Sequence, residues 1–163
     1  MKNLEDINNE EAVNQVRFIQ FDLGSENYGI KLLSVKEVIP MPDTTPMPNA
    51  PSHFIGIMNL RGQIISIIDL RKRLGVKPKT EGLEEAVIIV EYDGVGIGVV
   101  VDSINKVLNI NINDIAEVPE IGSKVNGKYI QGVYRVDDKL TIMLDLRKVL
   151  NIEDIKKSQQ EAA

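Results

Sequence analysis

The sequence predicts a mostly β fold. Apolar residues alternate with polar ones at the period-two spacing of half-buried strands, as in Ile19, Phe21 and Leu23. Pairs of such segments are separated by turn signals, of which Asp93-Gly94 is the strongest. Long helical periodicity is missing, while valine, isoleucine and glycine are abundant. These observations favour strands joined by tight hairpins, with helices limited to short turns.

The strands are expected in the following order. The alternating segment 19–23, the turn residues GSEN at 24–27 and YGIKLL at 28–33 predict a first hairpin. A second hairpin is predicted by AVIIVEY and VGIGVVV, which lie on either side of Asp93-Gly94. Further strands are expected at IISII and TIMLDL, residues 64–68 and 141–146.

Local capping patterns predict short helical turns between the strands. Ser34 and Glu37 have the spacing of a capping box, which would place Val35, Val38 and Ile39 on one face of a single helical turn.

A second set of capping signals follows later strands. Asp69 and Asp145 each precede a short apolar-periodic segment, so each carboxylate is expected to cap the N-terminus of a helical turn. Gly75 and Asn151 come after these segments, where a left-handed residue commonly ends a helix.

The connections and the chain ends are more polar. Residues 40–51 contain five of the seven prolines, which predicts an extended and rigid connection, and 109–128 is its more polar counterpart. The polar segments 1–16 and 153–163 are expected to be frayed tails. The folded domain is therefore expected to span 17–152.

The chain contains an internal repeat. The segment DLRK at 69–72 recurs at 145–148, a shift of 76 positions. Residues 18–39 match 87–108 after a shift of 69 positions, with Gly29 on Gly98. We interpret the match as a duplication of about 18–76 and 87–152. The alternative is that two β-hairpins resemble each other by chance, which the ungapped DLRK match makes weaker.

The size of the repeat predicts how the halves are arranged. Each half has about 60 residues, a length at which folding buries only roughly 60% of the chain's surface. Each half would be marginally stable alone. We therefore expect the halves to pack together about a pseudo-two-fold axis, with a groove between them.

The composition excludes several classes of protein. With 43% hydrophobic and 26% charged residues among 163, the chain is typical of one globular domain or two very small ones. No apolar run approaches the roughly 18 residues that a membrane-spanning helix needs. The polar stretch 1–15 lacks the apolar region of a secretory signal. No direct membrane insertion is expected.

Charge and cysteine content narrow the chemistry further. Without cysteine the chain can form no disulfide, thiolate nucleophile or cysteine-ligated metal site, which fits a reducing compartment. The formal net charge is -5, and the basic cluster at 71–73 is interpreted as the solvated face of a helix. Nucleic acid is not an expected partner, because nucleic-acid binders usually present a basic face.

No combination of side chains predicts catalysis or metal binding. His53 is the single histidine, and a usual zinc site would need further nitrogen or sulfur ligands. GVGIG at 94–98 lacks the spacing of a dinucleotide-binding loop and has no helix after it. The acidic pairs Glu84-Glu85 and Asp137-Asp138 are expected to be solvated. The sequence therefore predicts no enzyme, no metal and no cofactor.

The repeat diverges at one hairpin tip. Alignment of the halves places 59–62, with Arg61-Gly62, on 135–138, with Asp137-Asp138. Either both are acceptable turns set by local geometry, or the differing residues carry partner-specific function. The residues alone leave both alternatives open. Arginine supports the second, because its guanidinium donates several hydrogen bonds and is enriched at interface hot spots.

The sequence resembles the CheW family, the coupling proteins of bacterial chemotaxis. The segment NLRGQIISIIDLRKRLG at 59–75 resembles the family's most specific block, and the segments at 21–39 and 96–110 resemble two others in the same order. The resemblance runs from about Arg17 to Ile152.

The resemblance implies a fold and a function. The fold would be two small five-stranded β-barrels in pseudo-symmetric contact, with short helical turns. The function would be that of a cytoplasmic, non-enzymatic adaptor in a two-component signalling system. It would couple the cytoplasmic tips of methyl-accepting chemotaxis receptors to the histidine kinase CheA and be recruited to membrane receptor arrays.

The resemblance also assigns binding residues. Met41, Thr44 and Ile121 fall in segments that match kinase contacts of the family. Glu37, which also has capping-box spacing, would be a helix cap, a receptor contact, or both. The positions that match the family's receptor-binding region are Val35, Glu37, Val38, Gly56, Arg61, Gly62, Gly98, Ile104 and Val107.

Two alternatives share the fold. The chain could be the adaptor half of a CheV-type protein or a detached regulatory domain of the kinase. An enzyme or a small-molecule-binding β-barrel is a third alternative, but it would need a polar constellation in a pocket, and the sequence suggests none.

Overall fold

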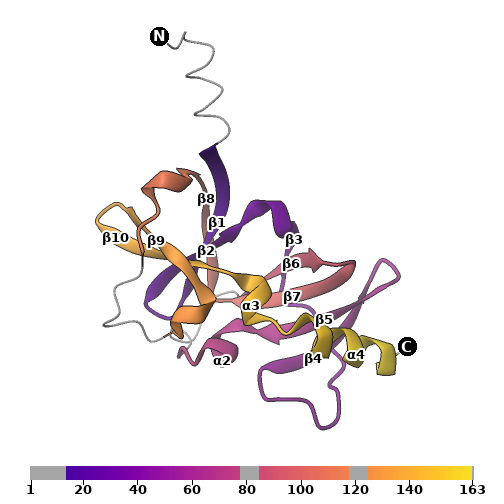
Figure 1. Cartoon of the computed structure of the whole chain (residues 1–163). Helices are drawn as coiled ribbons and strands as arrows, with labels where there is room; N and C mark the ends of the chain where they lie inside the picture. The colour runs from indigo at the N-terminus through magenta and orange to yellow at the C-terminus, as the bar shows by residue number, and fades with distance from the viewer. Residues whose placement is uncertain (1–13, 78–84, 118–124, 163) are drawn as a thin grey trace, which may run out of the picture.

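The computed structural model describes residues 14–77, 85–117 and 125–162, which form two five-stranded sheets (Figure 1). The predicted mostly β fold with two five-stranded units is confirmed. In sheet A the strand order is β8 (Ser103–Asn111), β1 (Gln15–Leu23), β2 (Glu26–Lys31), β10 (Lys139–Leu144), β9 (Ile130–Val136). In sheet B it is β3 (Val35–Pro40), β6 (Ala86–Tyr92), β7 (Val95–Val101), β5 (Gln63–Asp69), β4 (Phe54–Leu60).

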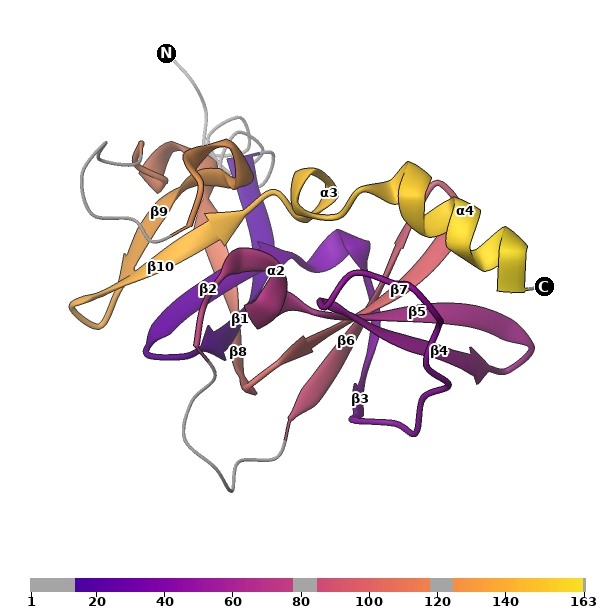
Figure 2. The same cartoon turned by 90° about the horizontal axis from the view of Figure 1, so that it is seen from below.

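Six short helices accompany the strands in the described part of the chain. Figure 2 shows α3 and α4 on the side of the molecule opposite to β3. The helices are η1 (Leu32–Ser34), α2 (Leu70–Leu74), η2 (Ile112–Asp114), η3 (Gly127–Tyr129), α3 (Leu146–Val149) and α4 (Ile152–Ala162).

The two sheets have the same pairing pattern in different parts of the chain. The order β8-β1-β2-β10-β9 becomes β3-β6-β7-β5-β4 when each strand is replaced by its counterpart in the repeat. Even the register is kept: β10 pairs with β2 through Met143 and Gly29, and β5 pairs with β7 through Ile67 and Gly98. Both of these pairings are parallel, while the other pairings in the sheets are antiparallel.

The sheets do not coincide with the halves of the repeat. Sheet B is built from the five consecutive strands β3 to β7, whereas sheet A combines β1 and β2 with β8, β9 and β10. Each half therefore contributes strands to both sheets. The sequence predicts that the halves pack together, but it does not predict this exchange of strands.

The main core is continuous between the sheets. One cluster of buried side chains contains Phe21 and Tyr28 from sheet A together with Ile88 and Val99 from sheet B. Between the strands of sheet A, the buried Gln20 amide donates a hydrogen bond of 2.7 Å to the Thr141 hydroxyl. Gln20 lies in an alternating segment, so its burial is a departure from the predicted half-exposed strand.

The predicted hairpin turns are confirmed, but the predicted capping box is wrong. Gly24 and Ser25 connect β1 to β2, and Asp93-Gly94 connects β6 to β7 with φ values of 52° and 78°. Residues 35–40 form strand β3 rather than a helical turn. Because β3 pairs with β6, long-range ladder hydrogen bonds outweigh the local signal from Ser34 and Glu37.

Three of the four other capping predictions are confirmed. The Asp69 carboxylate accepts a hydrogen bond from the Arg71 amide at 3.0 Å, and that of Asp145 accepts one from the Lys148 amide at 3.3 Å. Gly75 ends α2 with a left-handed φ of 72°. Asn151 does not end α3 in this way: its side chain instead accepts a hydrogen bond from the Asp154 amide at 3.4 Å, at the start of α4.

The C-terminal segment is a helix, which corrects the prediction of a frayed tail for 153–163. Ile155 of α4 is buried in the main core, and the Gln159 amide donates hydrogen bonds to Ser66 Oγ and to the Gly96 carbonyl. Ile152 is buried in the same core, so two apolar side chains and the Gln159 amide hold α4 over β5 and β7. At the other end, β1 begins at Gln15, inside the segment 1–16 that was predicted to be a tail; residues 1–13 lie outside the described residues.

Candidate functional site

The tip of the β4–β5 hairpin carries the residues that distinguish the two halves. Arg61 and Gly62 have positive φ values of 51° and 86°, which is the pattern of a two-residue type I′ turn. The Gly62 amide donates a hydrogen bond of 2.8 Å to the Asn59 side chain, which stabilises the turn. The predicted position of Arg61-Gly62 at a hairpin tip is confirmed.

Arg61 binds Glu37 through both terminal nitrogen atoms of its guanidinium. The two Nη atoms lie 2.6 Å and 3.2 Å from the two carboxylate oxygens of Glu37. Glu37 lies on β3 and Arg61 follows β4, and these strands are the opposite edges of sheet B. The ion pair therefore links the two edges of the sheet.

The pairing also fixes the charge of both groups. The hydrogen bond from Arg61 holds the pKa of Glu37 below its ordinary value, and the hydrogen bond to Glu37 raises the pKa of Arg61. The guanidinium side chain remains 75% exposed while it makes this contact. The arrangement thus presents an oriented arginine at the surface, and a hollow of about 250 Å³ adjoins it, lined in part by Leu60, Gln63 and Gly96.

The other half has the same contact with the charges reversed. Asp137 and Asp138 form the β9–β10 turn with φ values of 48° and 64°. Asp137 lies 3.5 Å from Lys106 on β8, and these residues occupy the positions equivalent to Arg61 and Glu37. The fold therefore retains an ion pair between sheet edges at both sites. The residues at the tip differ in the sign of their charge and in the length of their side chains.

Four of the predicted receptor-binding residues lie on equivalent edge strands. Val35 and Val38 are on β3 of sheet B, and Ile104 and Val107 occupy the equivalent positions on β8 of sheet A. Val35 and Ile104 both pack against the main core, whereas Val38 and Val107 are 42% and 53% exposed. Val38 and Val107 are thus apolar side chains that are available to a partner.

Two other predicted residues are buried glycines. A Cβ atom on Gly56 would lie 2.5 Å from the Thr45 carbonyl oxygen, and one on Gly98 would lie 2.7 Å from Ile67 and Val87. Close packing of neighbouring groups therefore explains glycine at both positions. Any effect of these glycines on binding would act through the strands that they hold together.

The predicted kinase-binding residues lie in or near the loop after β3. Met41 is exposed and Thr44 is half-buried, in the segment before the isolated bridge between Thr45 and Ile57. Ile121 lies outside the described residues.

A buried arginine network was missed by the sequence reasoning. The Arg71 guanidinium is bound by Asp69 at 2.9 Å, by Asp102 at 2.7 Å and by Glu85. Asp102 also accepts a hydrogen bond of 2.6 Å from the Gly24 amide in the β1–β2 turn. Burial opposes the charge of Arg71, but the hydrogen bonds to Asp69 and Asp102 outweigh it and raise the pKa.

The equivalent arginine makes an equivalent connection at the surface. Arg147 of α3 pairs with Asp93 in the β6–β7 turn and lies over the ring of Tyr92. Arg147 therefore reaches a hairpin turn of the other sheet directly, whereas Arg71 is connected to the β1–β2 turn through Asp102. The only signal in the sequence was the repetition of the arginine itself.

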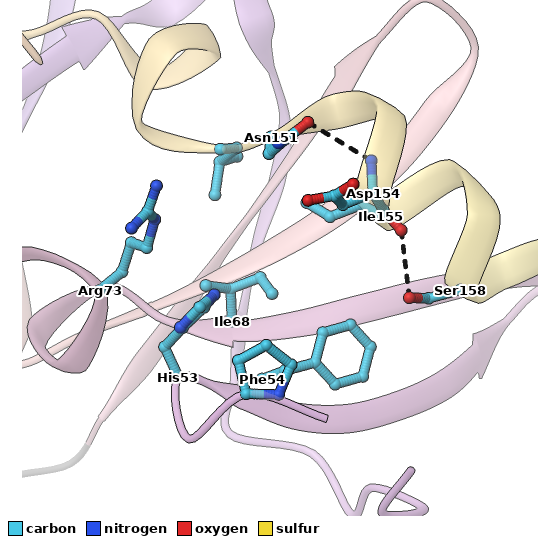
Figure 3. Close-up of a pocket in the computed structure, with 10 residues that line it drawn as sticks. His53, Phe54, Ile68, Arg73, Asn151, Asp154, Ile155 and Ser158 are labelled. Atoms are coloured by element: carbon cyan, nitrogen blue, oxygen red, sulfur yellow. Dashed lines mark hydrogen bonds between the residues drawn. The ribbon is translucent and has the colours of Figure 1, made fainter. Parts of the chain in front are cut away.

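The histidine lies in a second hollow. His53, Phe54 and Ile68 face Asp154 and Ile155 of α4 across a space of about 250 Å³ (Figure 3). Burial, together with the charge of Arg73, lowers the pKa of His53. Among the described residues, no group of three potential metal ligands is present, and none of their helices is long and apolar enough to cross a membrane.

The sequence matches known proteins along most of its length. The family model described as CheW-like domain matches residues 17–154. The chain is 34% identical to the chemotaxis protein CheW of Treponema pallidum, over 90% of this chain and 89% of that protein. It is 30% identical to CheW of Bacillus subtilis, over 84% and 88%. The chemotaxis protein CheV3 of Helicobacter pylori is 35% identical, over 76% of this chain but 41% of that protein.

A solved structure has the same fold. The scaffolding protein TtCheW from Thermoanaerobacter tengcongensis superposes with a TM-score of 0.76 at 33% sequence identity. The match covers 82% of this chain and 86% of that one.

Proposed function

The chain belongs to the CheW-like family, and from this premise we propose that it joins chemotaxis receptors to a CheA-type histidine kinase. Membership makes it a non-enzymatic adaptor of chemotaxis signalling. We infer that the adaptor works in the cytoplasm and is recruited to membrane receptor arrays through these two partners.

The observation that carries the proposal is the exposed, oriented arginine at the β4–β5 tip. Arg61 is held by both oxygens of Glu37, so little side-chain entropy is left to lose when a partner binds. Arginine fixed in this way can bind carboxylates or backbone carbonyls of a partner with defined geometry. The equivalent tip carries Asp137, so a partner that needs this arginine distinguishes the two halves.

The apolar part of the proposed receptor site comes from the edge strands. Val38 and Val107 are exposed, and Val35 and Ile104 are half-buried beside them. We infer that these side chains receive the apolar face of the receptor's helical hairpin, in the manner of a helix bound in a groove. Glu37 and Arg61, with Gly62 in the turn, would orient the helix at one end.

The proposed kinase site lies elsewhere. Met41 is exposed and Thr44 is half-buried in the proline-rich connection after β3, a rigid segment suited to an interface. Ile121 completes the proposed set from the second half of the chain. Weak contacts with both partners would gain strength from repetition in an array.

The test is the charge reversal Arg61→Glu. We expect the affinity for a receptor cytoplasmic fragment to fall about tenfold or more, as for the loss of an interface hot spot. Calorimetric titration would measure the binding. Thermal unfolding should be nearly unchanged, because exposed ion pairs contribute little to stability.

The matched control is Asp137→Arg at the equivalent turn. Asp137 has a positive φ of 48°, close to the 51° of Arg61, so the backbone at position 137 suits an arginine. Receptor affinity should stay unchanged in this variant. Equal losses in both variants, or unfolding of Arg61→Glu, would contradict the assignment of the receptor site to the β4–β5 tip.

A further inference from the structure

A wide hollow on the α3 side of the molecule has no part in the proposed receptor and kinase sites. Its volume is about 680 Å³, and it lies where α2, η3, α3 and the β6–β7 turn meet. It shares no lining residue with the hollow beside Arg61. In Figure 2, α3 lies on the side of the molecule opposite to β3.

Cations are concentrated in this hollow. Four of its lining residues are basic, and two, Asp93 and Glu153, are acidic, although the whole chain has a net charge of -5. Arg147 is neutralised by Asp93, and Lys148 lies 3.9 Å from Asp145. The four basic residues are Arg73, Lys128, Arg147 and Lys148.

Two of these cations are bound to the same aromatic ring. The Arg73 guanidinium carbon lies 5.5 Å from the centroid of the Tyr129 ring, and the Lys128 ammonium lies 5.0 Å from it. Arg73 donates its hydrogen bonds to uncharged oxygens, the Val149 carbonyl and the Tyr129 hydroxyl. Neither cation forms an ion pair with a carboxylate in the part of the chain that the structure describes.

This arrangement is electrostatically incomplete. Two like charges repel each other when they are held near one ring, and a bound anion would offset that repulsion. The Tyr129 ring and the hydrogen bonds of Arg73 fix one of the two cations in advance, which lowers the entropic cost of binding. The hollow is therefore prepared for negatively charged groups.

We propose that this hollow binds an extended acidic peptide segment of a protein partner through the carboxylates of its side chains. The hollow is wide and open, unlike the enclosed pockets that bury most of a small molecule's surface. Exposed ion pairs are individually weak, so useful affinity requires several carboxylates on one chain. Arg73 and Lys128 are the principal binding residues.

The proposal can be tested with a fluorescein-labelled polyglutamate peptide and the whole chain. Fluorescence anisotropy should show binding that weakens as salt is added. The backbone amide signals of Lys128 and Tyr129 should shift in NMR spectra during the titration. Lys128→Glu should weaken binding about tenfold, as for loss of a specific charge contact.

The matched control is Lys72→Glu, which makes the same change of charge on an exposed residue of α2 outside the hollow. The affinity of this variant for the peptide should differ from that of the unaltered chain by less than about twofold. Equal weakening by both substitutions would show general attraction and overturn the proposal, as would the absence of amide shifts at the hollow. Displacement of the peptide by an equal concentration of inorganic phosphate would also overturn it, because the site would then be one for small anions.

Discussion

Arg71 and Arg147 occupy equivalent positions in the repeat but lie in different surroundings. Arg71 is 8% exposed and is surrounded by Asp69, Glu85 and Asp102. Arg147 is exposed and pairs with the carboxylate of Asp93. The repeated arginine is therefore part of a buried ion-pair network in one half and of an exposed ion pair in the other.

Replacing each arginine by methionine should separate these roles. Arg71→Met leaves buried carboxylates without a cation, so the free energy of unfolding should fall by about 3–5 kcal/mol. Arg147→Met should leave the urea midpoint nearly unchanged, because exposed ion pairs contribute little. Equal midpoints for the two variants would show that burial of Arg71 has no energetic consequence.

The pKa of Glu37 makes a second prediction at the scale of the residue. Arg61 lowers this pKa, so the bidentate contact is complete above the ordinary pKa of a glutamate and is lost as the pH falls through the lowered value. Partner binding through Arg61 should therefore be independent of pH near neutrality. An NMR titration of the Glu37 carboxyl carbon should give a midpoint below the ordinary range, and Arg61→Gln should raise it. An unchanged midpoint in Arg61→Gln would exclude Arg61 as the cause.

At this scale the sequence predicts turns and caps better than networks. Arg61-Gly62 and Asp137-Asp138 are predictable as hairpin tips because each turn lies between apolar segments that are its immediate neighbours in the sequence. The Arg71 network was missed because Glu85 and Asp102 are 14 and 31 positions away in the chain. No local spacing encodes a contact of that length.

Among the elements, β3 shows where local signals fail. Ser34 and Glu37 have capping-box spacing, yet the segment 35–40 pairs with β6, which lies about fifty residues further along. Asn151 fails for a related reason, since the segment after it continues as α4 and uses Asn151 as an N-terminal cap. Strand alternation, hairpin turns and the Asp69 and Asp145 caps were predictable because each depends on neighbouring residues.

The parallel pairing of β5 and β7 makes a prediction about Gly98, a proposed receptor-site position. A Cβ there would lie 2.7 Å from both Ile67 and the stiff, branched side chain of Val87. Gly98→Ala should therefore cost about 1–3 kcal/mol of unfolding free energy through overpacking. The measurement is urea unfolding of the whole chain.

The matched variant is Gly29→Ala, at the equivalent parallel pairing of β2 and β10. There the close atom is the Met143 sulfur at 2.9 Å, at the far part of a flexible side chain, and the next neighbours lie at 3.6 Å. Gly29→Ala should therefore lower the free energy of unfolding by less than Gly98→Ala does. If Gly98→Ala lost receptor affinity at full stability, Gly98 would act in recognition rather than in packing.

At the scale of the whole molecule, the exchange of strands makes the two halves interdependent. Residues 1–80 and 81–163, produced separately, each lack strands that complete both sheets. We expect each fragment to show little β-structure by circular dichroism. Mixed, they should form a one-to-one complex with the spectrum of the intact chain.

Independent folding of either fragment would contradict this expectation. It would mean that five strands of one half can satisfy their backbone hydrogen bonds without the other half. The sequence identifies the repeat, but it cannot show which strands pair, because the two halves have nearly the same apolar pattern and each strand would fit either sheet.

The unequal continuity of the sheets also sets an order during protein synthesis. Sheet B is complete once Val101 has left the ribosome, but sheet A must wait for β10, which ends at Leu144. Until then the β1–β2 hairpin exposes Phe18, Phe21 and Tyr28, which are buried in the finished protein. A nascent chain in which β2 still lacks its partner β10 is open to aggregation and to chaperone binding.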